Sequence, residues 1–202
     1  MGPGSCRLIV NCCPLTGVFL LSNSTQQPGW LTPVSAPDYD REVERKLSRW
    51  ISAVSGLSGK MMFPKWQPND ETRVFPANNA NWCAFGISSI VSDDNPAFVN
   101  QTDESTELWR HEKIECLITF YGPAGQHHCT QFRDGITLSP NNAELNQIGL
   151  SLSSYGRIFS APELINNQWV RRYDMTVTLR RKVEREYGVK SLVDAPVKFF
   201  GD

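Results

Sequence analysis

The chain has 202 residues, with 20 basic and 21 acidic side chains and a formal net charge of -1. Hydrophobic residues make up 40% of it, which is enough to bury the core of one domain. This near-neutral balance excludes a general electrostatic attraction to nucleic acid, so contact with DNA would require a local basic patch.

Residues 1–37 are predicted to form an N-terminal extension and linker, followed by a single domain over residues 38–202. Apolar stretches at 8–10 and 17–21 are interrupted by polar residues and proline. Neither approaches the roughly 20 apolar residues that a membrane-spanning helix needs, and we expect no membrane contact. Residues 22–37 are rich in proline and small polar residues, as linkers are. We expect a flexible extension, and an arm lying on a neighbouring subunit is the alternative.

A helix is predicted to start at Asp38 or Asp40 and to end near Gly56, with acidic residues in its first turns. Apolar residues recur at helical spacing along it and define one buried stripe: Val43, Leu47, Trp50, Ile51 and Val54. Residues 60–66 then predict a short edge strand, because Pro64 is not tolerated in a central strand. Residues 67–81 predict a loop.

Two strands are predicted next, over residues 82–91 and 107–121. In the first, Cys83, Phe85, Ile87 and Val91 are expected on one face. In the second, the apolar series is Ile114, Cys116, Ile118 and Phe120, with polar residues opposite. The connection over residues 93–105 exceeds the usual hairpin length, and we interpret it as an extended β-arm that makes contacts.

The rest of the chain predicts a helix over residues 125–138, a short helix over 141–148 and an irregular strand over 152–164. Residues 169–183 predict the clearest strand, with apolar and polar residues alternating. Tyr173, Met175, Val177 and Leu179 are expected on its buried face. A last extended piece is predicted over residues 191–200.

This order predicts an α+β fold in which an antiparallel sheet of about four main strands carries helices packed on one face. The segments 114–120 and 173–179 are expected to be neighbouring strands of that sheet, because both have one apolar and one polar face.

No pattern for catalysis is present. The sequence has no glycine-rich phosphate loop and no strand–turn–helix around a serine nucleophile. His127 and His128 are adjacent, so on a helix they point about 100° apart and do not suit one metal ion. Cys129 lies beside His128 without an orienting third group. We therefore predict no catalytic residue, metal or cofactor, and a small Cys-dependent hydrolase is the enzymatic alternative.

The six cysteines are scattered rather than spaced as a disulfide framework, and we expect reduced thiols in a reducing compartment. These are Cys6, Cys12, Cys13, Cys83, Cys116 and Cys129.

Aromatic and charged residues near the predicted strand ends are the candidates for a subunit or partner interface, because aromatic side chains and arginine are enriched at interfaces. The candidates are Trp66, Asp93, Asp94, Phe98, Trp109, Tyr121, Trp169, Arg171, Arg180 and Arg181. The basic stretch over residues 171–190 has three interpretations that the sequence leaves open. It could be a solvent face of the sheet, a contact with DNA phosphates or a contact with an acidic partner.

Four short motifs carry a resemblance to a known family. They are Ile118–Pro123 (ITFYGP), Trp66–Pro68 (WQP), Trp82–Gly86 (WCAFG) and Trp169–Asp174 (WVRRYD). In these motifs the chain resembles the neck or tail-terminator proteins of tailed bacteriophages, over about residues 38–184.

The resemblance implies a small α+β subunit of a hexameric ring that caps the tail tube and joins it to the head connector. It implies contacts with the tail tube protein and with head-connector or head-completion proteins, and DNA passing through the lumen without sequence-specific binding. It also implies location in the virion after assembly in the host cytoplasm, and no active site. A different head-completion or minor tail protein is the nearest alternative. A nucleic-acid-binding module that uses residues 171–190 is a third.

Overall fold

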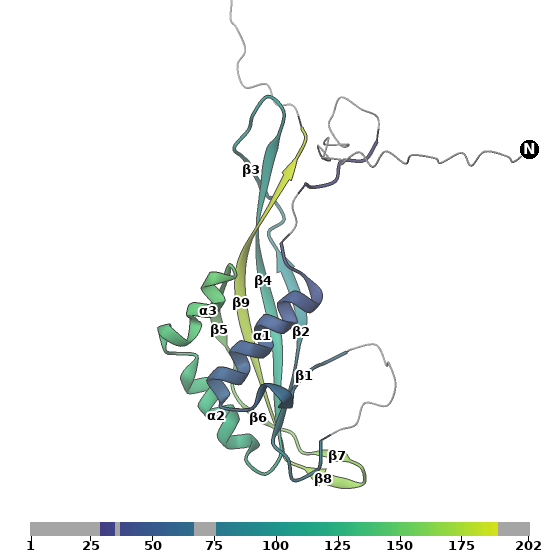
Figure 1. Cartoon of the computed structure of the whole chain (residues 1–202), viewed down its shortest axis with the longest axis vertical. Coiled ribbons are helices and arrows are strands. Elements are labelled where there is room, and N and C mark those ends of the chain that lie inside the picture. The colour runs from purple at the N-terminus through teal and green to yellow at the C-terminus, as the bar shows by residue number, and fades with distance from the viewer. Residues whose placement is uncertain (1–28, 35–36, 67–75, 190–202) are drawn as a thin grey trace, which may run out of the picture.

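A long twisted sheet runs the length of the molecule, and the helices cover one of its faces (Figure 1). The computed structural model describes residues 29–34, 37–66 and 76–189. Within them the helices are α1 (Asp40–Ser55), α2 (Gly125–Gly135) and α3 (Ala143–Gln147), with 3-10 turns η1 (Gly59–Met61) and η2 (Ser139–Asn142). None of these helices has the length and apolar character needed to cross a bilayer.

The main sheet has the strand order β1-β2-β4-β9-β5, and two further short strands, β3 and β6, pair with β4 and β9. The strands are β1 (Met62–Pro64), β2 (Trp82–Ser92), β3 (Ala97–Val99), β4 (Thr106–Tyr121), β5 (Leu150–Tyr155), β6 (Phe159–Ser160) and β9 (Arg172–Tyr187). β7 (Glu163–Ile165) and β8 (Gln168–Val170) form a separate hairpin. The predicted α+β class is confirmed, with more strands than the four expected.

The predicted neighbours β4 and β9 pair over their whole length. Ile114 lies opposite Leu179, and Cys116 lies opposite Val177. Residues directly opposite in a sheet share a face, so the two apolar series merge into one buried surface. The helices pack on this surface, as predicted.

The apolar stripe of α1 is buried against that surface, and each large side chain there contributes about 1.5–3 kcal/mol of burial free energy. Trp50 meets the ring of Phe132 from α2 edge-on, with centroids 5.0 Å apart. Its indole N–H donates to the Asn141 carbonyl at 3.1 Å, so the buried polar atom is satisfied. Gly56 adopts φ 72 and ends the helix in the left-handed conformation that glycine tolerates.

Two details of the predicted sheet were wrong. β1 is an edge strand, as Pro64 indicated, but it runs parallel to β2, with Met62 opposite Cys83 and Pro64 opposite Phe85. A bulge between Ile87 and Ser89 shifts the alternation of β2 by one residue. Val91 therefore lies opposite Lys113 on the outer face and is 60% exposed, instead of facing the core.

The segment after β2 does form an extended β-arm, because β3 folds along the start of β4 and pairs with it. The predicted irregular strand at 152–164 divides into parts of β5, β6 and β7. Several predictions lie outside the described residues: most of the N-terminal extension and linker, residues 67–75 of the predicted loop and the last extended piece.

Candidate interaction surfaces

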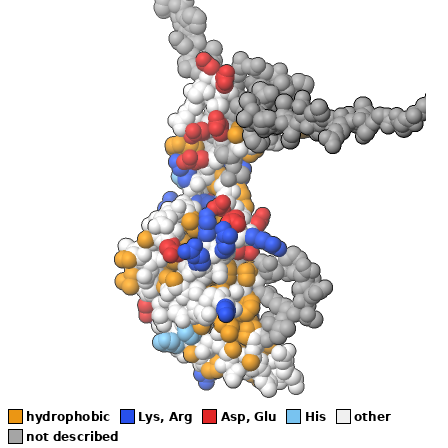
Figure 2. Space-filling view, in the orientation of Figure 1, with side chains coloured by type: hydrophobic (Ala, Val, Ile, Leu, Met, Phe, Trp, Pro, Cys, Tyr) orange, Lys and Arg blue, Asp and Glu red, His pale blue; other side chains and the backbone are white. Residues whose placement is uncertain are grey.

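A projecting arm is the most distinctive surface of the molecule. We define the distal arm as residues 93–110 together with residues 182–187 of β9, where the sheet extends beyond the helices (Figure 1). It carries seven carboxylates against three basic side chains. The carboxylates are Asp93, Asp94, Asp103, Glu104, Glu107, Glu184 and Glu186. Acidic atoms accordingly gather at this end of the space-filling view (Figure 2).

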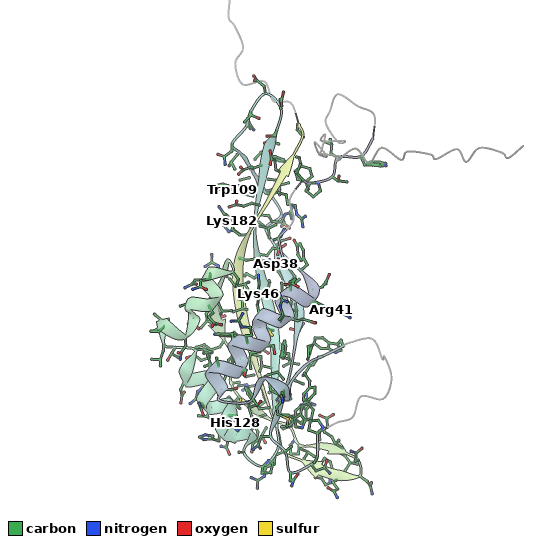
Figure 3. All side chains as sticks on the ribbon, in the orientation of Figure 1. Asp38, Arg41, Lys46, Trp109, His128 and Lys182 are labelled. Carbon is green, nitrogen blue, oxygen red and sulfur yellow. The ribbon has the colours of Figure 1, made fainter. Side chains whose placement is uncertain are left out.

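The predicted candidates Phe98 and Trp109 lie on this arm, and the exposed Asp93 and Asp94 lie at its start. Phe98 is 58% exposed. Trp109 is covered on one face by the Lys182 ammonium, which lies 3.5 Å from the ring centroid (Figure 3). The Trp109 indole N–H donates to Glu107 Oε2 at 2.8 Å. These contacts hold Trp109 on its own subunit and leave Phe98 as the outward-facing ring of the arm.

Arg181 was predicted as an interface residue, but it is buried at the base of the arm. The alternation that buries Leu179 continues to Arg181, so its side chain enters the core side of the sheet. Its Nε donates to Glu112 Oε2 at 2.7 Å, and Nη1 donates to the Asp38 carbonyl at 2.8 Å. The guanidinium also lies over the Tyr39 ring at 4.5 Å. Arg181 therefore fastens the arm to the start of α1.

Tyr121 is the second candidate that the fold buries, at 6% exposure. Its ring stacks on Trp82 with centroids 3.9 Å apart, beneath the β7–β8 hairpin. Its hydroxyl donates to Glu163 Oε2 at 2.9 Å. Burial, together with this carboxylate, raises the pKa of Tyr121 far above its ordinary range. Its role in the isolated subunit is to anchor the hairpin.

The β7–β8 hairpin lies at the end of the molecule opposite the distal arm (Figure 1). Leu164 and Trp169 are cross-strand partners and are 53% and 75% exposed. Asn166 and Asn167 both have positive φ, which the tight turn between the strands requires. The exposed Arg171 follows at the start of β9. An exposed tryptophan on a rigid turn is a common anchor at protein interfaces.

Trp66 is exposed on the outer edge of the sheet, where the structure places it against β2. It is 64% exposed and has a positive φ of 55. A side chain at Gly86 would come within 2.6 Å of the indole, so the ring occupies the space that this glycine leaves open.

The basic stretch of residues 171–190 does not form one patch in the described part of the chain. Strand alternation sends its members to opposite faces, and most are engaged within the subunit. Arg172 pairs with Asp174 and Glu163, which raises its pKa further, and Arg185 donates to the Tyr39 hydroxyl. Arg171 and Arg180 are the exposed arginines of this stretch.

The pair His128–Cys129 has no catalytic geometry. Cys129 is fully buried, and burial raises the pKa of its thiol to about 12. His128 Nδ1 instead contacts the Ser55 carbonyl at 2.9 Å, at the end of α1 (Figure 3). Cys83, Cys116 and Cys129 are all free thiols in the described residues, and no group of three metal-ligating side chains occurs there.

A groove on the outer face of α1 was missed from the sequence. It is a hollow of about 620 Å³ between α1, the turn η1, the end of β1 and the start of α3. The lining residues are Arg41, Glu44, Arg45, Ser48, Arg49, Ser52, Ala53, Gly59, Pro64 and Glu144. We call it the arginine groove. The signal was present, because Arg41, Arg45 and Arg49 recur every four residues and therefore share one face of the helix.

Comparison with protein-family models gives a match to the phage neck terminator protein family over residues 41–202. The chain belongs to this family. The resemblance seen in the four sequence motifs is thereby confirmed, and the match spans the whole described domain from the first turn of α1 onward. A search of individual curated proteins gave no match. Both candidate surfaces, the distal arm and the β7–β8 hairpin, belong to the part of the chain that matches the neck terminator family.

Proposed function

We propose that this neck terminator is a structural subunit that forms a ring at the head-facing end of a phage tail and joins the tail tube to the head connector. Membership of the phage neck terminator family over residues 41–202 carries the proposal. The ring has six copies on the basis of the family resemblance. It is assembled in the host cytoplasm and retained in the virion.

The shape of the subunit supports this role. Subunits of a closed ring contact each other through two different surfaces, so each needs an element that reaches its neighbour. The distal arm projects beyond the helices and provides such an element (Figure 1). The β7–β8 hairpin provides a chemically different surface at the other end. We propose that the distal arm serves the neighbouring subunit and that the hairpin is available to the tail tube or head connector.

The charge distribution supports a lumen that lets DNA pass. Most basic side chains of β9 are engaged with carboxylates or aromatic rings of the same subunit. Strong phosphate binding requires several free lysines or arginines on one surface, and β9 does not present such a surface. The exposed arginines of α1 are assigned below to a contact between subunits. We propose that DNA crosses the ring without sequence-specific binding and that the role of the protein is structural rather than catalytic.

The proposal is tested by removing the gene from an infecting phage and examining the lysate by electron microscopy. We expect DNA-filled heads and separate tails, with joined particles restored when the purified protein is added. Joined, infectious particles in the absence of the protein would overturn the proposal. Heads joined to tails of altered length or lacking tip structures would instead indicate a minor tail protein.

A further inference from the structure

We propose that the carboxylates of one subunit's distal arm dock in the arginine groove on α1 of a neighbouring copy. The inference deepens the proposed function, because it assigns two specific surfaces to the contact between ring subunits.

The groove presents cationic groups that its own subunit neutralises weakly. Arg41, Arg45 and Arg49 are all exposed, and the side chains of Arg45 and Arg49 are 69% and 73% exposed. Arg45 pairs with Glu42 on the helix surface, and Arg49 lies 4.0 Å from Glu144. Exposed pairs of this kind contribute little and exchange readily for a better partner.

The groove also has space for another chain. Ala53, Gly59 and Pro64 are among its lining residues and have small side chains, so the subunit's own side chains do not fill the hollow. Basic atoms gather in the middle of the molecule (Figure 2), where α1 lies across the sheet in the same view of Figure 1. Arg41, at the start of α1, belongs to this basic region and is labelled beside the helix in Figure 3. An arginine fork binds carboxylates in a defined geometry, which favours discrete acidic side chains as the occupant.

The distal arm supplies those side chains. Asp94, Asp103 and Glu104 are exposed, and no ion pair to a described residue occupies them. The three basic side chains of the arm make contacts within their own subunit other than with these three carboxylates. Arg110 donates to the Asp93 carbonyl at 2.8 Å, Arg185 donates to the Tyr39 hydroxyl, and Lys182 covers Trp109. Lys182 also pairs with Glu184, but Asp94, Asp103 and Glu104 have no ion pair to a described residue, so the arm keeps a net negative surface.

The contact must be between copies. The arm of the same subunit extends away from the helices, and its base is fixed by the buried Arg181–Glu112 pair (Figure 1). DNA is the less suitable occupant, because Glu44 and Glu144 separate the arginines, so the groove offers discrete cationic positions and not the continuous basic surface that a run of phosphates requires. Opposite charges on two surfaces of one chain suit a head-to-tail ring, in which every subunit offers both.

The test is a charge exchange in the complete phage. R45E/R49E reverses the groove, and D103R/E104R reverses the arm. Like charges would then face each other, and we expect either double variant to lower the yield of joined particles by about tenfold or more. The variant with all four substitutions should restore the yield, because the opposite signs meet again. R157E is the matched control, because it reverses the charge of an exposed arginine on the loop between β5 and β6.

Each outcome decides between the explanations. Wild-type yields from both double variants, or no recovery with the fourfold variant, would overturn the docking contact. A defect confined to R45E/R49E that arm reversal does not repair would indicate DNA or another acidic partner. The proposed function is separable from these outcomes, because the gene deletion alone tests whether the protein joins heads to tails. Circular dichroism of each variant confirms that the exposed substitutions leave the fold intact.

Discussion

Arg181 and Glu112 form a buried ion pair across β9 and β4, with Nε and Oε2 2.7 Å apart and side chains only 7% and 11% exposed. The pair lies at the base of the distal arm, because Lys182 follows Arg181 on β9 and Arg181 also donates to the Asp38 carbonyl just before α1. It therefore connects the part of the subunit that has a core to the part that extends away from it.

Removing one partner of this pair should destabilise the domain strongly. R181M leaves the Glu112 carboxylate buried without its counter-ion and removes the hydrogen bond to the Asp38 carbonyl. We expect a loss of about 3–5 kcal/mol in the free energy of unfolding, measured by urea denaturation. R181M/E112L should recover part of it. R180M, at the neighbouring exposed position, is the control and should change stability by less than about 0.5 kcal/mol. A similar small loss for R181M would show that the pair is unimportant.

Gly122 should not tolerate a side chain. Its φ is 104, and a Cβ there would lie 2.2 Å from the Ala80 carbonyl oxygen. G122A combines backbone strain with a clash against main chain, and we expect a loss of about 3 kcal/mol or more in thermal or urea unfolding. Gly149 provides the matched control, with φ 73 and nothing within 4 Å of the same position. G149A should cost only about 1–2 kcal/mol, from the left-handed backbone alone. Equal losses would show that the clash is relieved.

The buried thiols should make the fold sensitive to alkali. Burial raises the pKa of Cys116 from 9.0 to about 12 and that of Cys83 well above 9.0. The folded state therefore retains protons that the unfolded chain loses. The contribution of the protonated thiols to the free energy of unfolding is complete below about pH 9 and is lost as the pH rises toward 12.

Each thiol should lower the free energy of unfolding by about 1.4 kcal/mol per pH unit in this window. Urea midpoints at several pH values between 8 and 11 measure the slope. C116A should reduce the slope of unfolding free energy against pH by about 1.4 kcal/mol per pH unit, the contribution of one thiol. This comparison separates the effect of Cys116 from that of other groups that titrate in alkali. An unchanged slope in C116A would contradict the prediction.

Trp169 should contribute to assembly and not to folding. Its side chain is 75% exposed on the β7–β8 hairpin, whereas Trp82 is buried and stacked on Tyr121. W169A should leave the free energy of unfolding within about 0.5 kcal/mol of wild type and lower the yield of joined particles. W82A should cost about 3–5 kcal/mol in the same unfolding measurement. Normal particle yield from W169A would remove the hairpin from the list of partner surfaces.

The sequence by itself determined the α+β class, the helix α1 and the pairing of β4 with β9. These features depend on the spacing of apolar residues along the chain, which is a local property. The alternation within each strand assigns its apolar residues to one buried face. This face holds every second residue from Ile114 to Phe120 and from Tyr173 to Leu179. The family motifs added the neck terminator assignment.

Only the tertiary structure decided which polar and aromatic side chains are exposed. Arg181 looks like a surface residue in the sequence, but the sheet register places it opposite Glu112 in a buried position. Tyr121 is covered by a hairpin about 40 residues later in the chain. The bulge that exposes Val91 and the groove beside α1 likewise depend on contacts between distant segments. Local periodicity carries no information about such contacts, because they form only when the elements pack together.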